Sequence, residues 1–300
     1  MSVKTRHIIC LFLTAAIWGF AFVFQKTGGD SMGSFTFNML RNVLGALTVI
    51  PVVIKTYGSL KPDKETLKGG IICGFFLGIA SCIQQVGIEL TTPGKAGFLT
   101  SIYMVIVAMS GFLFKRKTER TTWIGVVVAV IGLYYLCIPK GESFSLTLGE
   151  ILCITSAFLY ACQIISIDMF IDRVEGIKMS FIQFITAAVV SFVLVLITGE
   201  QVTISGIMGG LGPLLYVGIM STGVAFTLQI VGQQGVDPAI ASLIMSLESL
   251  FSVIGEWLIL GLLLSGRELL GCLFMGIAVL ITQLPALMPI IKRKLGINGN

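Results

Sequence analysis

Long apolar runs alternate with short polar turns along the whole chain. A helix needs about 20 predominantly apolar residues to cross the hydrocarbon core of a bilayer, and each run is close to that length. The pattern predicts ten such helices, over residues 8–26, 35–56, 69–90, 94–114, 121–138, 148–170, 177–198, 209–232, 237–263 and 267–290. The sequence therefore predicts an all-α integral membrane protein with ten transmembrane helices.

Turn-forming residues stand between the predicted helices. The glycine and proline signals at residues 28–30, 61–63 and 92–94 each separate two apolar runs. No polar or low-complexity segment between the runs is long enough to form a second, soluble domain. We therefore expect residues 1–300 to form a single transmembrane domain.

The composition excludes several classes of protein. Charged residues make up 12% of the chain and the mean hydropathy is +0.97, whereas a soluble domain carries about 25% charged residues. The net charge of +5 does not indicate nucleic-acid binding, because the Lys and Arg residues sit in short loops at the predicted membrane edges. With one histidine, seven cysteines and no CxxC pair, the sequence predicts no metal site and no cofactor.

Lys and Arg collect on one side of the predicted membrane. If the N-terminus is cytoplasmic, fifteen of the twenty basic residues lie in inner segments and four lie in outer loops or at outer helix edges; Arg41 lies within a span. Cytoplasmic loops of membrane proteins carry such an excess of basic residues. We therefore expect a multi-pass protein of the cell membrane with both termini in the cytoplasm.

One stretch of the sequence occurs twice. Residues 78–101 match residues 223–246 at eight positions after a shift of 145, and the matches include Gln84 with Gln229. Each half holds five predicted helices, an odd number, so the second half must enter the membrane from the opposite side. We expect residues 6–138 and 148–290 to form two inverted five-helix repeats, an arrangement typical of transporters.

Four motifs in order resemble a known family. Residues 18–26 read WGFAFVFQK, the second predicted helix carries Phe37 and Arg41, residues 91–101 read TTPGKAGFLTS, and residues 246–249 read SLES. Together they resemble the EamA-type family of the drug/metabolite transporter superfamily over almost the whole chain. The Gly-Glu that often closes the fourth and ninth helices of that family is absent here. The resemblance implies a transporter of small organic solutes, often metabolites or amino acids and often exported.

Several side chains with useful chemistry lie near the predicted midplane. Counting about 1.5 Å per residue along each helix places Trp18, Tyr103, Tyr160 and Glu248 roughly 14 to 18 Å deep, and a bilayer core is about 30 Å thick. The predicted repeat pairs Trp18 with Tyr160 and Tyr103 with Glu248. We expect these four residues, with the neighbouring Gln163, to bind substrate; helix packing is the structural alternative for the aromatic residues, hydrogen bonding between helices for Gln163, and a structural carboxyl for Glu248.

Four further polar residues lie inside predicted helices. Gln84 and Gln229 fall at mirrored depths and could line the pathway on either side of the site, although hydrogen bonding between helices explains them equally well. Arg41 and Glu256 each lie roughly 10 Å below the outer surface by residue count. We expect Arg41 and Glu256 to form an ion pair or to close an outer gate.

These features predict a secondary transporter that exports small organic metabolites such as amino acids by alternating access. Its expected partners are the solute, the lipid bilayer and a proton as a candidate coupling ion; the oligomeric state stays open. A channel or scaffold without a substrate cycle is the alternative. An intramembrane enzyme is less favoured, because the sequence has no paired histidines, no carboxylate dyad and no nucleophile beside a base.

The predicted topology can be tested by cysteine labelling. We expect Asn300→Cys to react only from the cytoplasmic side and Gly141→Cys to react from outside intact cells. Labelling of Asn300→Cys from outside, or of Gly141→Cys only from inside, would show that the topology is wrong.

Overall fold

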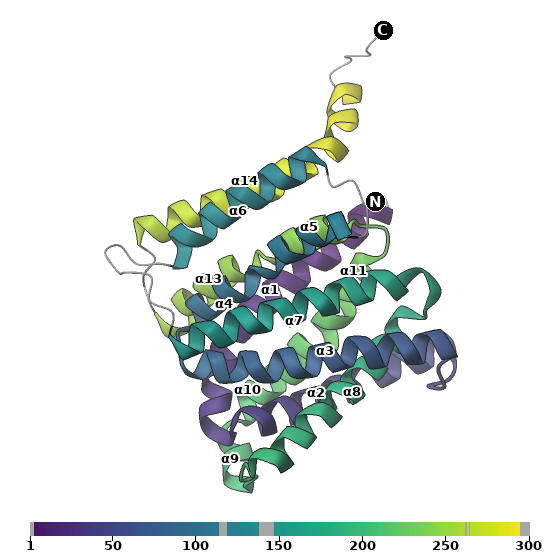
Figure 1. Cartoon of the computed structure of the whole chain (residues 1–300), viewed down its shortest axis with the longest axis vertical. Helices are drawn as coiled ribbons and strands as arrows, with labels where there is room; N and C mark the ends of the chain where they lie inside the picture. The colour runs from purple at the N-terminus through teal and green to yellow at the C-terminus, as the bar shows by residue number, and fades with distance from the viewer. Residues whose placement is uncertain (1–2, 114–118, 138–146, 262, 264, 295–300) are drawn as a thin grey trace.

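The computed structural model describes residues 3–113, 119–137, 147–261, 263 and 265–294, so Gly141 and Asn300 lie outside the described residues. The secondary structure of this part of the chain is helical throughout (Figure 1). Its elements are α1 (Val3–Met32), α2 (Ser34–Tyr57), α3 (Lys64–Glu89), α4 (Pro93–Ser101), α5 (Tyr103–Leu113), α6 (Arg120–Cys137), α7 (Leu148–Phe170), the 3-10 turn η1 (Ile171–Arg173), α8 (Gly176–Thr198), α9 (Ile204–Gly209), α10 (Leu211–Leu215), the π-helix η2 (Tyr216–Phe226), α11 (Thr227–Gln233), α12 (Pro238–Met245), α13 (Glu248–Leu260) and α14 (Gly266–Lys294).

Eight helical segments in the described residues are long and apolar enough to cross a membrane. They correspond to predicted helices one to four and six to nine. The fifth predicted helix corresponds to α6, of which Arg120–Tyr135 counts as a shorter apolar helix, and the tenth corresponds to α14. The all-helical membrane class is therefore confirmed, whereas the number of ten spans and the inverted repeat stay predictions.

The turns gather at two ends of the bundle. At the end that carries the N-terminus, Lys178 donates to the backbone oxygen of Lys61 at 3.1 Å, and His7 lies beside the turn at Gly235. At the opposite end, the Glu200 carboxylate accepts from the backbone nitrogens of Phe35 and Thr36 at the start of α2. Consecutive long helices therefore run in alternating directions between the two ends.

Local sequence signals set where several helices begin and end. The side chains of Asp63 and Thr92 accept hydrogen bonds from backbone nitrogens in the first turns of α3 and α4, which satisfies donors that have no partner within the helix. Thr147 and Glu150 form a reciprocal capping box at the start of α7. The left-handed Gly58 and Gly199 end α2 and α8.

Two predicted helices are interrupted instead of continuous. The fourth is divided into α4 and α5 at Ile102, and the ninth is divided into α12 and α13 at Ser246 and Leu247. Hydroxyl groups bond backbone carbonyls beside the second break, with Ser246 donating to Leu243 at 2.7 Å, and such bonds compete with regular helix geometry. Under the shift of 145, Ile102 corresponds to Leu247, so the two breaks fall at matching positions of the predicted repeat.

The eighth predicted helix contains the π-helix η2, and α1 packs against it. The hydroxyl of Thr14 donates to the Ala225 carbonyl at 3.1 Å, and the indole nitrogen of Trp18 donates to the Ser221 carbonyl at 3.2 Å. These bonds give partners to carbonyls of a segment whose wider turns depart from the α-helical pattern. Wide turns of this kind often occur at functional sites.

Close approach of helices depends on glycine in α3. A Cβ atom added at Gly70 or Gly78 would stand 2.5 Å from Ile182 or 2.8 Å from Val190 of α8, and one at Gly74 would stand 2.5 Å from the Gln183 carbonyl oxygen. The ridge of small residues thus lets α3 and α8 pack backbone against backbone. By contrast α6 packs mainly against α14, and the two lie side by side at the edge of the bundle (Figure 1).

We expect Gly74→Ala to lower the free energy of unfolding by about 1–3 kcal/mol, because the new methyl group would overlap α8. The matched control is Gly276→Ala in α14, where an added Cβ meets nothing within 4 Å. The measurement is unfolding of the purified protein by SDS titration in mixed micelles. Equal stability of the two variants would contradict this account of the α3–α8 contact.

Candidate substrate site

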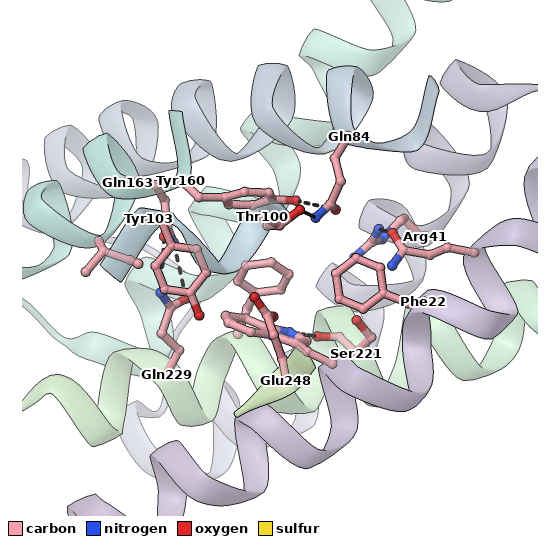
Figure 2. Close-up of a pocket in the computed structure, with 14 residues that line it drawn as sticks. Phe22, Arg41, Gln84, Thr100, Tyr103, Tyr160, Gln163, Ser221, Gln229 and Glu248 are labelled. Carbon is pink, nitrogen blue, oxygen red and sulfur yellow. Dashed lines mark hydrogen bonds between the residues drawn. The ribbon is translucent and has the colours of Figure 1, made fainter. Parts of the chain in front are cut away.

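A cavity lies in the interior of the bundle, lined from α1, α2, α3, α4, α5, α7, η2, α11 and α13 (Figure 2). It leaves about 30 Å³ for the centres of water-sized molecules, within about 400 Å³ of space between protein atoms. That free volume holds about two water molecules. A metabolite can therefore enter only if the surrounding helices move apart.

Aromatic side chains form much of the cavity wall. The rings of Trp18 and Phe226 lie 4.5 Å apart between centroids, and the bond from Trp18 to the Ser221 carbonyl fixes the orientation of the indole. Phe22 and Tyr103 complete this apolar surface. Such rings offer flat faces on which the apolar part of a solute can pack.

A chain of hydrogen bonds joins three helices at another side of the cavity. The Tyr160 hydroxyl donates to Gln84 Oε1 at 2.9 Å, and Gln84 Nε2 donates to Thr100 Oγ1 at 3.1 Å (Figure 2). Tyr160 belongs to α7, Gln84 to α3 and Thr100 to α4. All three side chains are buried, so each bond satisfies polar groups that water does not reach.

Glu248 is the first residue of α13 and its side chain points into the cavity. The residue is 3% exposed, and its Oε1 accepts a long hydrogen bond of 3.4 Å from Ser101. The buried hydroxyl of Tyr103 lies beside this carboxyl, close enough to interact with it as a hydrogen-bond partner although the geometry of the bond is not ideal. The pair therefore keeps unused capacity to bind a polar group.

Arg41 enters the cavity from α2. Its Nε donates to Thr222 Oγ1 at 3.0 Å and its Nη1 donates to Gln25 Oε1 at 2.7 Å. These contacts connect α2 with η2 and α1. Arg41 is only 3% exposed, so it is a buried cation held by neutral groups.

The expected ion pair between Arg41 and Glu256 is not present among the described residues, and the alternative, that the two residues close an outer gate, stays a prediction. The helix α2 packs on α8 and η2, where Arg41 bonds to Thr222, while the Glu256 carboxylate on α13 faces the start of α4. There Glu256 Oε1 accepts from the backbone nitrogen of Gly94 at 2.9 Å. Equal depth in the membrane did not place the two residues on facing sides of neighbouring helices.

Four buried glutamines cluster at the side of the cavity toward the N-terminal end of the bundle. The side chains of Gln163 and Gln229 exchange hydrogen bonds of 3.1 and 3.3 Å, and Gln163 also donates to Gln183 at 3.1 Å. Gln233 donates to the Ile164 carbonyl at 3.1 Å. Neutral amides from α7, α8 and α11 thus close this side of the cavity.

The structure brings together most of the side chains singled out from the sequence. One cavity is lined by Trp18, Arg41, Gln84, Tyr103, Tyr160, Gln163, Gln229 and Glu248, whereas Glu256 does not line it. Their function as a substrate site stays a prediction. The residues that sequence reasoning missed are Phe22, Gln25, Thr100, Ile164, Ser221 and Phe226; of these, a buried polar position in an apolar run was a usable signal for Gln25.

Fold and cavity together define a class: a multi-pass helical membrane protein with a buried cavity, lined by aromatic and polar side chains, between its spans. Within that class, the chain belongs to the EamA-like transporter family, whose sequence profile matches residues 5–138 and 147–284. The resemblance read from the four sequence motifs is therefore confirmed. A membrane transporter role follows at the level of the family.

Similar proteins agree with this assignment. The chain is 28% identical over 280 residues to an uncharacterized transporter of Archaeoglobus fulgidus, covering 91% of this chain and 84% of that protein. It is 22% identical over 220 residues to the uncharacterized transporter YoaV of Bacillus subtilis, covering 71% and 74%. A crystal structure of a protein that is 16% identical shares the fold with a TM-score of 0.77, covering 94% of this chain and 98% of that one.

Double-mutant cycles test the contacts of Arg41. We expect the stability losses of Arg41→Gln and Glu256→Gln to add within about 0.5 kcal/mol, because the two side chains share no contact. Arg41→Gln with Gln25→Leu should instead show a coupling of about 0.5–3 kcal/mol, because the two are hydrogen-bonded. Coupling of Arg41 to Glu256 that exceeds its coupling to Gln25, in SDS titrations of the purified variants, would contradict the geometry.

Proposed function

We propose that the chain is a secondary transporter that exports small organic metabolites such as amino acids by alternating access. The observation that carries this proposal is the buried cavity with polar and aromatic walls. Membership of a transporter family and a charged residue at the predicted mid-membrane depth both support it. Ionisable groups inside membrane spans are costly and are usually retained for function. The proposal places the solute between Glu248, Tyr103 and Tyr160, with Trp18 and Gln163 completing the site.

Both halves of the chain contribute to this cavity. Trp18, Gln84 and Tyr103 come from residues 6–138, and their counterparts Tyr160, Gln229 and Glu248 come from residues 148–290. Secondary transporters with inverted repeats bind substrate at such a repeat interface and expose it by rocking one half against the other. The matching breaks at Ile102 and Leu247 support the same two-fold relation.

The small size of the cavity fits a transport cycle in which the cavity opens and closes. The centres of water-sized molecules find only about 30 Å³ in it, so in the proposed cycle both binding and release include motion of the surrounding helices. At one side the barrier consists of neutral amide bonds such as that between Gln163 and Gln229. Exchange of one neutral hydrogen bond for bonds to water costs about 0.5–1.5 kcal/mol, less than the separation of a buried ion pair would cost.

The proposed transporter has a defined orientation in the membrane, and a proton drives its transport. With the basic residues inside, the N-terminal end of the bundle faces the cytoplasm, and the amide cluster closes the cytoplasmic side. Glu248 is the candidate site for a coupling proton, because its carboxyl is buried and only the neutral hydroxyls of Ser101 and Tyr103 are recorded as its side-chain partners among the described residues. Gln84 and Gln229 line the pathway on either side of it.

Counterflow in proteoliposomes tests the transport cycle. We expect vesicles loaded with an unlabelled mixture of the common amino acids to accumulate a labelled amino acid above equilibrium, because one binding site alternates between the two sides. A channel gives equilibration without accumulation, and a scaffold gives neither. Either result, obtained with protein that remains folded after reconstitution, would contradict the proposed function.

We expect Glu248→Gln to keep the fold, because amide and carboxyl have nearly the same shape, and to lose proton-driven uphill transport or its pH dependence. The matched control is Glu256→Gln, which changes a partly buried carboxyl in the same helix outside the cavity. Uptake against a gradient is compared at several external pH values. A wild-type rate with an unchanged pH profile in Glu248→Gln would make this residue structural.

A further inference from the structure

Arg41 is a buried cation in the cavity wall that is held by neutral groups. The residue is 3% exposed. Its hydrogen bonds within the described residues go to Gln25 Oε1 at 2.7 Å and to Thr222 Oγ1 at 3.0 Å. Removing a charge from water is costly unless a counter-charge replaces the lost hydration. These two contacts therefore leave the positive charge of the guanidinium uncompensated.

The cavity wall gives Arg41 no direct counter-charge within the described residues. Glu248 is the one carboxylate among the side chains that line it, and no ion pair joins Glu248 to Arg41. Figure 2 shows the two side chains reaching in from different sides, Arg41 from α2 and Glu248 from α13. The groups within electrostatic range of the guanidinium are the Tyr160 hydroxyl and the Cys82 thiol, which are ordinarily neutral near pH 7.

Two donor groups beside Arg41 are left over from this arrangement. An arginine can only donate, so the oxygen of the Gln25 amide must face it and the amino group Nε2 is left for another partner. Neither Gln25 Nε2 nor Arg41 Nη2 makes a hydrogen bond within the part of the chain that the structure describes. Both residues line the cavity, and the bond between them keeps their unused donors close together. A guanidinium and an amide donor on one wall suit an anion.

The size of the cavity restricts which anion can bind without opening it. The centres of water-sized molecules find about 30 Å³ there, which is room for about two water molecules. A monoatomic anion such as chloride is little larger than water and fits that space. An organic carboxylate of several carbon atoms fits only after the surrounding helices move apart.

We propose that the closed cavity binds a small inorganic anion, chloride or bromide, between Arg41 and Gln25, as the exchangeable counter-charge of the buried guanidinium. Charge-assisted bonds from Arg41 and a neutral bond from the Gln25 amide hold the anion. The anion stabilises the closed form because it balances a charge that the protein leaves unbalanced. This inference does not depend on the proposed function, since it concerns the closed cavity and is tested by binding without transport.

Thermal unfolding of the purified full chain tests the site. Chloride replaces gluconate, which is too large for the cavity, at constant ionic strength, and the measured quantity is the melting temperature in chloride minus that in gluconate. We expect this difference to rise by about 2–4 °C when chloride reaches about ten times its dissociation constant, and bromide to act in the same way. Equal melting temperatures in chloride and gluconate overturn the proposal.

Gln25→Glu is a test that damage to the fold cannot imitate. The side chain keeps nearly the same shape and places a carboxylate where the amide oxygen now accepts from Arg41. We expect this variant to be at least as stable in gluconate as the wild type and to lose the response to chloride, because the counter-charge is now built in. A variant that is less stable than the wild type in gluconate, or that keeps the full response to chloride, overturns the proposal.

Variants at Arg41 separate the site from a general effect of salt. Arg41→Gln should lose the chloride response, whereas Arg41→Lys keeps the charge without the planar fork and should keep a response at higher chloride concentrations. The matched control is Arg267→Gln, which removes an arginine that stacks on Tyr134 and Tyr135 outside the cavity and should respond as the wild type does. An equal response in Arg41→Gln and Arg267→Gln shows a general salt effect and overturns the site.

Discussion

Polar groups buried inside an apolar bundle constrain this structure more than any other feature, because each must find a partner where water is scarce. The Tyr160–Gln84–Thr100 chain fixes the rotation of α7, α3 and α4 relative to one another. Trp18 does the same for α1 and η2 through a backbone carbonyl. The apolar side chains turned toward lipid impose no comparable register, since one packs on hydrocarbon much as another does.

Small residues allow these polar contacts to form at short range. Gly70, Gly74 and Gly78 bring α3 against α8, and the approach of α4 to α13 lets Glu256 reach the backbone nitrogen of Gly94. The first contact depends on the absence of a side chain, and the second on a backbone donor in the first turn of a helix, which has no partner within that helix. Packing and hydrogen bonding therefore select the same arrangement of helices.

The sequence predicted how deep a residue lies in the membrane, but not which neighbouring helix its side chain faces. Counting residues along apolar runs placed Trp18, Tyr103, Tyr160 and Glu248 at similar heights, and the structure brings them to one cavity. The same count gave Arg41 and Glu256 equal heights, but helix neighbours and facing sides depend on contacts that a linear pattern does not contain. The π-helix η2 was missed for a related reason: its carbonyl partners, Thr14 and Trp18, lie about two hundred residues away along the chain.

The charged side chains and the groups that close the cavity lie in different parts of it. Arg41 and Glu248 lie at the cavity and can form strong, directional hydrogen bonds. A change of partner there has a large effect on the free energy. The boundary toward the N-terminal end is made of glutamine amides, whose bonds are neutral and interchangeable with water. Had the charges formed the boundary, each opening would have separated an ion pair in a medium of low dielectric constant. Under the proposed function, a neutral boundary around the charged side chains lets the path to the site open at modest cost in free energy.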